Sequence, residues 1–461
     1  MSTQDQSRRN FLKVMSAAGA TLAMAGGAKA APEAEAQGKN VALLKTPPME
    51  KIRVGFIGVG ARGSGHVSSM MKLDGVEVIA ICDTHEPSRK ASVNNVVKNG
   101  RKEPAAFGDK GELHYQEMLK RDDLDIVIIA TPWEWHTRMC VDAMNAGKHA
   151  FTEVPAAVTE EECWQLVNTA EKTQKHCMML ENCCYGREEL FCLNLIAQGM
   201  LGELLHGEGG YLHDLRGQMH EVAHGTGSWR TYHYIKRNGN LYPTHGLGPL
   251  AQYMNINRGD KFDYMSSVSS PAFGRADYAK KNFPPDHNWN KVEKWNGGDQ
   301  NTSIIKTALG RSIIVQFNET SPRPYSRINL IRGTKGIFMG YPSRLMIEGV
   351  TPGGETWIDD NGKDSKLEEF MKTNEHPLWK KMGELAKKNG GHGGMDFIML
   401  WRVATCLRNG EPLDQTVYDA AAWSSVGPLS EKSVAAKSCN VDFPDFTRGA
   451  WKTTPPLGII S

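Results

Sequence analysis

The sequence predicts an α/β protein with two domains. The N-terminal domain is expected to hold a doubly wound parallel sheet, and the C-terminal domain an α+β fold with an open, mostly antiparallel sheet. Over residues 51–185, short apolar runs alternate with helical patterns, which is typical of parallel strands joined by crossover helices. Over residues 186–461, strand patterns follow one another with few helices between them, which favours antiparallel pairing.

The first predicted strand, residues 52–57, runs directly into a glycine-rich turn. In such a turn Gly58 permits the change of direction, Gly60 lets a pyrophosphate approach the backbone, and Gly63 lets the next helix pack on the strand. That helix is expected from Gly63 to about residue 72, with its N-terminal amides facing the phosphates. The arrangement predicts a Rossmann dinucleotide-binding domain.

The second predicted strand, residues 76–82, ends at Asp83, twenty positions after the last glycine of the turn. A carboxylate at this point accepts a hydrogen bond from the ribose 2′-hydroxyl and repels a 2′-phosphate. The sequence therefore predicts NAD rather than NADP as the cofactor. A glycine-rich turn that binds no nucleotide is the alternative, and the combination of strand, spacing and acid disfavours it.

The other elements of the first domain continue the alternation of strand and helix. We expect a helix from about residue 87, a strand at 126–130, a helix at 141–146, a strand at 149–152, a helix at 160–175 and a strand at 177–180. Right-handed crossovers then place these strands parallel in one sheet. Residues 31–50, rich in Ala, Pro, Glu and Gly, are expected to form a flexible linker ahead of this domain.

The second domain reads mainly as strands. They are expected at residues 203–213, 262–269, 301–308, 311–318, 326–332 and 336–339, with late helices at 395–407 and 416–436. One face of such an open sheet would stay uncovered, and a homo-oligomer could form through it.

The first 30 residues have the features of a twin-arginine export signal. Arg8 and Arg9 precede the apolar stretch 14–27, which is too short to cross a bilayer, and Ala28-x-Ala30 suits a signal peptidase. We expect export of the folded protein by the twin-arginine machinery, hence a periplasmic or secreted location. An apolar helix that stays attached is the alternative.

Composition indicates a globular protein without a nucleic-acid or membrane-surface partner. The 461 residues are 40% hydrophobic and carry a formal net charge of only +2, with no block of like charges. The nine cysteines are scattered without metal-ligand spacing, and we interpret them as small buried side chains rather than a disulfide framework.

One motif competes with this interpretation, since His220, Glu221 and His224 satisfy the His-Glu-x-x-His pattern of zinc proteases. The pattern requires a continuous helix, which the nearby Gly225 disfavours, and Arg230 stands where a third histidine would be. We therefore predict no metal.

Further motifs resemble the Gfo/Idh/MocA oxidoreductase family. They are the glycine turn, Asp83, Thr131-Pro132, Ala146-Gly147-Lys148-His149 and Glu153-x-Pro155. In dehydrogenases of that family the last motif is Glu-Lys-Pro, with the lysine as acid/base. Here Val154 stands in the middle and cannot move a proton, so the acid/base group must lie elsewhere or the chemistry must differ.

Four segments narrow the resemblance to glycoside hydrolase family 109, the NAD-dependent α-N-acetylgalactosaminidases. They are Trp133-Glu134-Trp135-His136, Glu153-Val154-Pro155, the segment Glu181 to Tyr185, and Tyr242-Pro243-Thr244-His245-Gly246-Leu247-Gly248-Pro249. The resemblance spans about residues 51–450. It implies that a sugar is oxidised at C3 by NAD, loses its C2 proton and its C1 substituent, takes up water and is reduced again, with no net redox change.

The resemblance also implies roles for particular residues. His245 would exchange the C3 hydroxyl proton and Tyr242 would take the C2 proton, although both could merely bind sugar hydroxyls. Tyr211, Tyr325, Pro243 and Thr244 would complete the sugar site, with strand packing as the alternative for the tyrosines. The expected cofactor residues are Gly58, Gly60, Arg62, Gly63, Asp83, Trp133, Glu134, Trp135, His136, Glu153, Val154, Asn182 and Arg230.

Several alternatives stay open from the sequence. Trp133 and Trp135 could equally be core aromatics. The protein could be an NAD-dependent sugar dehydrogenase, which Val154 disfavours, or a sugar-binding protein that keeps NAD as a structural element. A glycosidase with paired carboxylates is also conceivable, but the 52 acidic residues offer too many pairs to select one.

Overall fold

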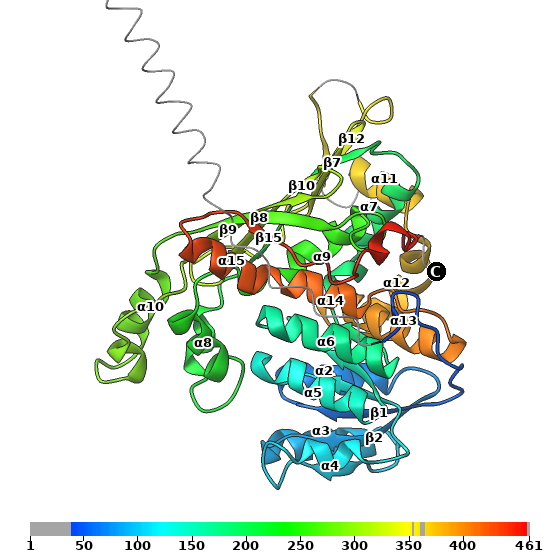
Figure 1. Ribbon diagram of the computed structural model, residues 1–461, viewed down its shortest axis with the longest axis vertical. Helices are drawn as coiled ribbons and strands as arrows, with labels where there is room; N and C mark the ends of the chain where they lie inside the picture. The colour runs from blue at the N-terminus through cyan, green and yellow to red at the C-terminus, as the bar shows by residue number, and fades with distance from the viewer. Residues whose placement is uncertain (1–37, 353–354, 360–364, 459–461) are drawn as a thin grey trace, which may run out of the picture.

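The computed structural model describes residues 38–352, 355–359 and 365–458. The predicted export signal, residues 1–30, and the first part of the predicted linker lie outside the described residues. Two sheets form the body of the molecule, and helices α9 (Thr244–Tyr253) and α14 (Val417–Ser424) lie between them (Figure 1).

The N-terminal sheet has six parallel strands in the order β3-β2-β1-β4-β5-β6, which is the doubly wound Rossmann order. The strands are β1 (Ile52–Ile57), β2 (Val76–Cys82), β3 (Ala105–Phe107), β4 (Ile126–Ile129), β5 (His149–Thr152) and β6 (Cys177–Met179). The helices are α2 (Ala61–Met70), α3 (Glu86–Lys98), α4 (Tyr115–Leu119), α5 (Trp133–Asn145) and α6 (Glu160–Thr173). The predicted fold of this domain is confirmed.

Two details of this domain differ from the prediction. The short β3 and α4 were not expected, because three and five residues are too few to show a periodic pattern. Helix α5 starts at Trp133 rather than at residue 141, directly after Pro132, which is its N-cap. The buried side of its first turn carries Trp133 and His136. The segment Trp133–His136 therefore lies on a helix N-terminus beside the end of β4.

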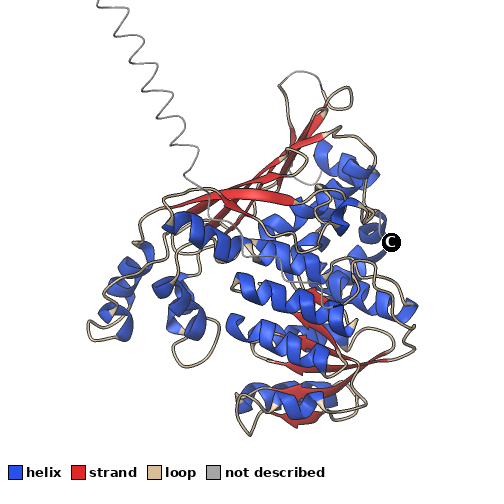
Figure 2. Ribbon diagram, in the orientation of Figure 1, coloured by secondary structure: helices blue, strands red, loops and turns tan. Residues whose placement is uncertain are grey.

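The C-terminal sheet has nine strands in the order β14-β13-β12-β11-β7-β10-β9-β8-β15 (Figure 2). Within this sheet, among its described strands, only β7 and β10 pair in parallel, so the predicted mostly antiparallel sheet is confirmed. The strands are β7 (Leu204–Leu212), β8 (Phe262–Ser269), β9 (Asn301–Thr307), β10 (Ser312–Asn318), β11 (Leu330–Gly333), β12 (Gly336–Met339), β13 (Arg344–Ile347), β14 (Ile358–Asp359) and β15 (Val441–Asp442).

More helices accompany this sheet than the sequence predicted. The α-helices are α7 (Arg187–Ala197), α8 (Gly227–Lys236), α9, α10 (Gly274–Asn282), α11 (Lys366–Thr373), α12 (Pro377–Asn389), α13 (Met395–Asn409), α14 and α15 (Val426–Ala435). Short 3-10 turns are η1 (Asn182–Tyr185), η2 (Arg216–His220), η3 (Asn288–Lys291), η4 (His392–Gly394) and η5 (Ala450–Lys452). Helices α9 and α15 cover one face of the sheet (Figure 1). On the strands, Tyr264, Val268 and Ile304 are exposed.

Two boundaries of this domain were wrong in the prediction, and so was part of the linker ahead of the first domain. The single helix expected at 416–436 is two helices, α14 and α15, which meet at Ser425. Strand β11 begins at Leu330 rather than at 326, because Ile328 and Asn329 have φ angles of +65° and +48° and turn the chain away from an extended path. Part of residues 38–50 packs against the second domain and is not only a flexible linker. Val41 is buried, and its amide donates a hydrogen bond to the Tyr418 hydroxyl.

The cysteines agree with their interpretation as buried side chains. All nine are free, and only Cys439 among them is exposed. In the part of the chain that the structure describes, no helix has the length and apolar character needed to cross a membrane.

The core also contains a carboxyl group without a close hydrogen-bond donor. Glu319 follows β10, is fully buried, and neither of its carboxylate oxygens has a hydrogen-bond partner. Its nearest cation is Arg230, whose Nη1 lies 3.7 Å from Oε1. Burial raises the pKa of Glu319 to about 7, because Arg230 offsets only part of the lost hydration.

We predict different effects on stability for two alanine substitutions in the glycine turn. A Cβ on Gly63 would lie 2.0 Å from the carbonyl oxygen of Gly58, whereas a Cβ on Gly60 would meet nothing within 4 Å. Gly63→Ala should therefore lower the free energy of unfolding by about 1–3 kcal/mol. Gly60→Ala should leave it nearly unchanged. Thermal unfolding of the two variants tests this, and equal melting temperatures would contradict the predicted packing.

Glu319 should make stability depend on pH. Between pH 4.5, the ordinary pKa, and about 7, the unfolded chain has released this proton while the folded chain retains it. Rising pH then favours the unfolded state, so this group's contribution to the free energy of unfolding falls across that window and levels off above it. As the pH rises from 4.5 to about 7, the melting temperature of Glu319→Gln should increase relative to that of the parent. A constant difference would contradict the raised pKa.

Candidate functional site

A cavity of about 430 Å³ lies where the carboxyl ends of β1, β2, β4 and β5 face the second domain. The Rossmann domain contributes the glycine turn, Asp83, His85 and the first turn of α5 to its walls. The second domain contributes residues of β7, α8, α9 and η4. Among the predicted site residues, those that line it are Gly58, Gly60, Arg62, Asp83, Trp133, Trp135, His136, Glu153, Val154, Asn182, Tyr211, Arg230, Tyr242 and His245.

The glycine turn and Asp83 fit a dinucleotide. Gly58 has a φ of +80°, and a Cβ there would lie 2.6 Å from the Ala130 carbonyl oxygen, so this position requires glycine. The space beside Gly60 is open, as a phosphate approaching the backbone needs. The Asp83 carboxylate accepts hydrogen bonds from the amides of Val59 and His85, both at 2.8 Å, which holds it beside the turn.

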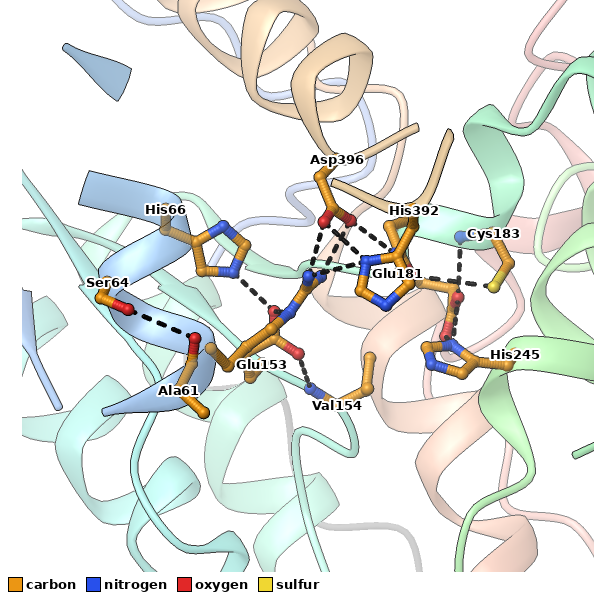
Figure 3. A network of polar contacts seen from close by, with 12 residues as sticks. Ala61, Ser64, His66, Glu153, Val154, Glu181, Cys183, His245, His392 and Asp396 are labelled. Carbon is orange, nitrogen blue, oxygen red and sulfur yellow. Dashed lines mark hydrogen bonds and ion pairs between the residues drawn. The ribbon is translucent and has the colours of Figure 1, made fainter. Parts of the chain in front are cut away.

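Arg62 joins the glycine turn to the second domain. Its Nε donates to Glu153 at 2.7 Å, while Nη1 and Nη2 donate to the Asp396 carboxylate of α13 at 2.6 and 3.0 Å. His66 Nε2 lies 2.6 Å from Glu153 (Figure 3), and the Asn182 side-chain amide donates to Asp396 at 2.6 Å. Burial alone would raise the pKa values of Glu153 and Asp396, but Arg62 and the neighbouring histidines hold both well below their usual range. Both carboxylates are therefore ionised.

His245 forms the most informative pair in the cavity. It lies in the first turn of α9, and its Nδ1 is 2.7 and 3.0 Å from the two carboxylate oxygens of Glu181, which lies two residues after β6 (Figure 3). Burial would raise the pKa of Glu181, but the contact with His245 outweighs it and lowers that pKa. An ionised carboxylate only accepts hydrogen bonds, so Nδ1 of His245 carries a proton, and Nε2 is the nitrogen available for proton exchange. The pair is thus arranged for proton transfer at Nε2.

Glu181, Cys183 and His245 also place one potential metal-ligand atom each within 4.8 Å of one another. Their existing contacts disfavour a metal, because the Glu181 carboxylate already accepts from His245 and from the Cys183 amide. Burial raises the pKa of the Cys183 thiol, and a thiol is a poor metal ligand.

A second histidine, His392, reaches the cavity from the segment before α13. It stands among glycines, with Gly393 and Gly394 both at positive φ, and its own φ is +53°. Its Nδ1 lies 2.8 Å from Asp396 Oδ2 (Figure 3). Because Asp396 is ionised, Nδ1 donates and Nε2 is the nitrogen available for proton exchange. The side chain is 59% exposed, so it can equilibrate with solvent.

Aromatic side chains form the wall around His245. The ring of Tyr211 lies 4.7 Å from that of Tyr242 and 5.2 Å from the imidazole of His245. Tyr325, 38% exposed, lies 6.1 Å from Tyr211 toward the outside. Trp133 packs 5.7 Å from Tyr242 on the Rossmann side. Apolar ring faces with polar edges are the surfaces on which sugar rings pack.

Arg230 is the charged neighbour of Tyr242. It is buried in α8, with its guanidinium carbon 4.6 Å from the centre of the Tyr242 ring and 4.7 Å from that of Trp133. Burial raises the pKa of Tyr242 above its usual range, and Arg230 opposes that shift. Arg230 therefore lies beside the aromatic wall around His245 as well as the expected cofactor residues.

Five predicted residues lie outside the walls of this cavity. Gly63 packs on the turn, Glu134 contacts His233 at 3.5 Å, and Tyr325 lies farther out. Pro243 is the N-cap of α9 and Thr244 its first residue, so they position His245 rather than face the cavity.

The sequence analysis assigned no role to Glu181, His392 or Asp396. Glu181 could have been predicted from the sequence, because an acidic residue that follows a strand of a parallel sheet lies at the edge where such sheets bind ligands. His392 and Asp396 come from a distant part of the chain, and only the glycines around His392 pointed to them.

Two family models match the chain and together span most of it. The model described as Oxidoreductase family, NAD-binding Rossmann fold, matches residues 52–181. The model described as Glycosyl hydrolase 109, C-terminal domain, matches residues 185–453. The NAD-binding domain and the glycoside hydrolase domain therefore meet at the cavity.

Relatives cover nearly the whole chain. A glycosyl hydrolase family 109 protein of Shewanella baltica (strain OS185) is 56% identical over 461 residues, covering 98% of both chains. An alpha-N-acetylgalactosaminidase of Shewanella oneidensis is 55% identical over 460 residues, with the same coverage.

Solved structures share the fold at low identity. Levoglucosan dehydrogenase in complex with NADH and levoglucosan has a TM-score of 0.63 at 19% identity, covering 86% of this chain and 100% of that chain. Scyllo-inositol dehydrogenase from Lactobacillus casei has a TM-score of 0.58 at 15% identity, covering 86% and 99%. With its NAD-binding Rossmann domain and its family-specific C-terminal domain, the chain belongs to glycoside hydrolase family 109 and is an NAD-dependent glycoside hydrolase.

Proposed function

We propose that the protein removes terminal α-linked N-acetylgalactosamine from glycans by oxidation, elimination, water addition and reduction, with no net redox change. The observation that carries this proposal is the His245–Glu181 pair, which shares one cavity with the dinucleotide turn. The relative from Shewanella oneidensis supports the choice of sugar by its name. Val154 supports a departure from ordinary dehydrogenase chemistry, since it lines the cavity without an ionisable group.

NAD would be held by the glycine turn, Asp83 and the residues around Arg62, and it supplies hydride acceptance and return at the sugar C3. The residues of the chain then have to move protons. His245 takes the C3 hydroxyl proton through Nε2 and later returns it, while Glu181 holds the ring and stabilises its charged form. A fixed carboxylate partner makes that exchange reversible within one cycle.

Tyr242 is the proposed acceptor of the C2 proton. Its burial opposes ionisation, so it needs the adjacent positive charge of Arg230 to act as a base. The C2 proton of the sugar is acidic only once C3 is a ketone. The rings of Tyr242 and His245 lie 5.0 Å apart, so the two side chains can serve the adjacent carbons C2 and C3. Tyr242 and His245 thus divide the two proton transfers between them.

His392 is the proposed acid/base group that exchanges a proton with the oxygen bound to C1 of the sugar. Leaving-group departure needs a proton donor, and the addition of water needs an acceptor. His392 lines the cavity, is oriented by Asp396 and exchanges with solvent through its exposed side. The cavity therefore holds two histidine–carboxylate pairs, one buried and one near solvent.

We predict that His245→Ala and Glu181→Gln both lower kcat strongly without releasing NAD. Loss of a positioned acid/base group costs about 10²–10⁴-fold in rate, and loss of the orienting carboxylate costs at least about 100-fold. Mass spectrometry of the denatured variants should still find NAD. Glu203→Gln, an exposed carboxylate ahead of β7, serves as the control and should keep full activity. Parental turnover in either variant would contradict the role of the pair.

The deciding experiment for the proposed function is a panel of aryl glycosides assayed without added nucleotide. We expect cleavage of the aryl α-N-acetylgalactosaminide, no net NADH absorbance at 340 nm, and deuterium at C2 of the sugar when the solvent is D2O. Steady accumulation of NADH would favour a sugar dehydrogenase instead. Sugar product without C2 deuterium would exclude the elimination step.

A further inference from the structure

The His-Glu-x-x-His segment is a loop at the edge of the cavity and not a continuous helix. His220 ends η2 and stacks on Phe283, with ring centres 4.6 Å apart. Glu221 accepts a hydrogen bond from the Gly227 amide at 2.8 Å, which fixes the start of α8. These two residues shape the loop on the side of the second domain. The third motif residue, His224, faces the other way.

His224 makes a contact across the cavity edge. Its ring stacks on that of His85 in the Rossmann domain, with ring centres 3.7 Å apart and planes inclined by 19°. Both histidines line the cavity. His224 is exposed and His85 is half-buried, so the stack lies at the surface and bridges the two domains above the cavity.

His85 lies at the end of the cavity where the adenosine half of NAD is expected to bind. It is the N-cap of α3, and its amide donates to the Asp83 carboxylate at 2.8 Å. Its Nδ1 lies 2.8 Å from the Ser88 hydroxyl, which fixes the ring orientation. In a Rossmann domain the carboxylate after the second strand holds the ribose of the adenosine half. The stacked rings therefore lie beside the position of that ribose.

We propose that His85 and His224 form a stacked pair that closes the adenosine end of the cavity and retains bound NAD. Opening of the stack is then a step in cofactor release. Loss of the stacking contact is expected to raise the rate of NAD release by about 2- to 10-fold. This inference concerns cofactor retention alone and does not depend on the sugar or the mechanism proposed above.

The test measures NAD release from the purified holoprotein. The protein is transferred into nucleotide-free buffer that contains ethanol and alcohol dehydrogenase, so that released NAD gives absorbance at 340 nm. His85→Ala and His224→Ala should each release NAD about 2- to 10-fold faster than the parent. His224→Phe keeps a flat ring and should release NAD at close to the parental rate.

A double variant and a matched control separate the stack from other effects. Because both histidines serve one contact, His85→Ala/His224→Ala should release NAD no faster than the faster single variant. Val222→Ala, an exposed residue of the same loop, should leave release unchanged. Parental release from either single variant, multiplied effects in the double variant, or fast release from Val222→Ala or His224→Phe would each overturn the proposal.

Discussion

The ion pairs of Arg62 with Glu153 and Asp396 are the interaction on which the rest of the site depends. Arg62 belongs to the glycine turn, Glu153 follows β5, and Asp396 lies on α13 of the second domain. One guanidinium thus joins the dinucleotide turn, the residue after β5 and the first turn of α13, which follows the segment that carries His392. Removing it would leave two buried carboxylates without their main partner, a costly arrangement in a protein interior.

The two histidine–carboxylate pairs divide the cavity into different environments. Glu181 is fully buried and holds His245 in a place shielded by aromatic rings. Asp396 holds His392 at an exposed position, where protons exchange with water. This division would suit the proposed cycle, in which one proton returns to its donor and another exchanges with the solvent.

The local parts of the fold and site were predictable from the sequence. The glycine turn, Asp83 and β1 to β6 follow from contiguous patterns, apart from the three-residue β3. Residues brought in from afar were not predictable, as with Asp396, which contacts Arg62 from 334 positions away. Helices α7 to α12 were hidden by mixed apolar and polar spacing, and tertiary packing decides their form. The export signal stays a prediction, because its residues lie outside the described part of the chain.

The free cysteines have a consequence for how the protein is handled. Eight of the nine thiols are buried, and burial raises the pKa of Cys163, Cys184 and Cys192, so the native protein presents few reactive thiolates. The unfolded chain would expose all nine together, and air oxidation could then join sulfurs that the native fold keeps apart. Renaturation from denaturant therefore calls for a reductant such as dithiothreitol.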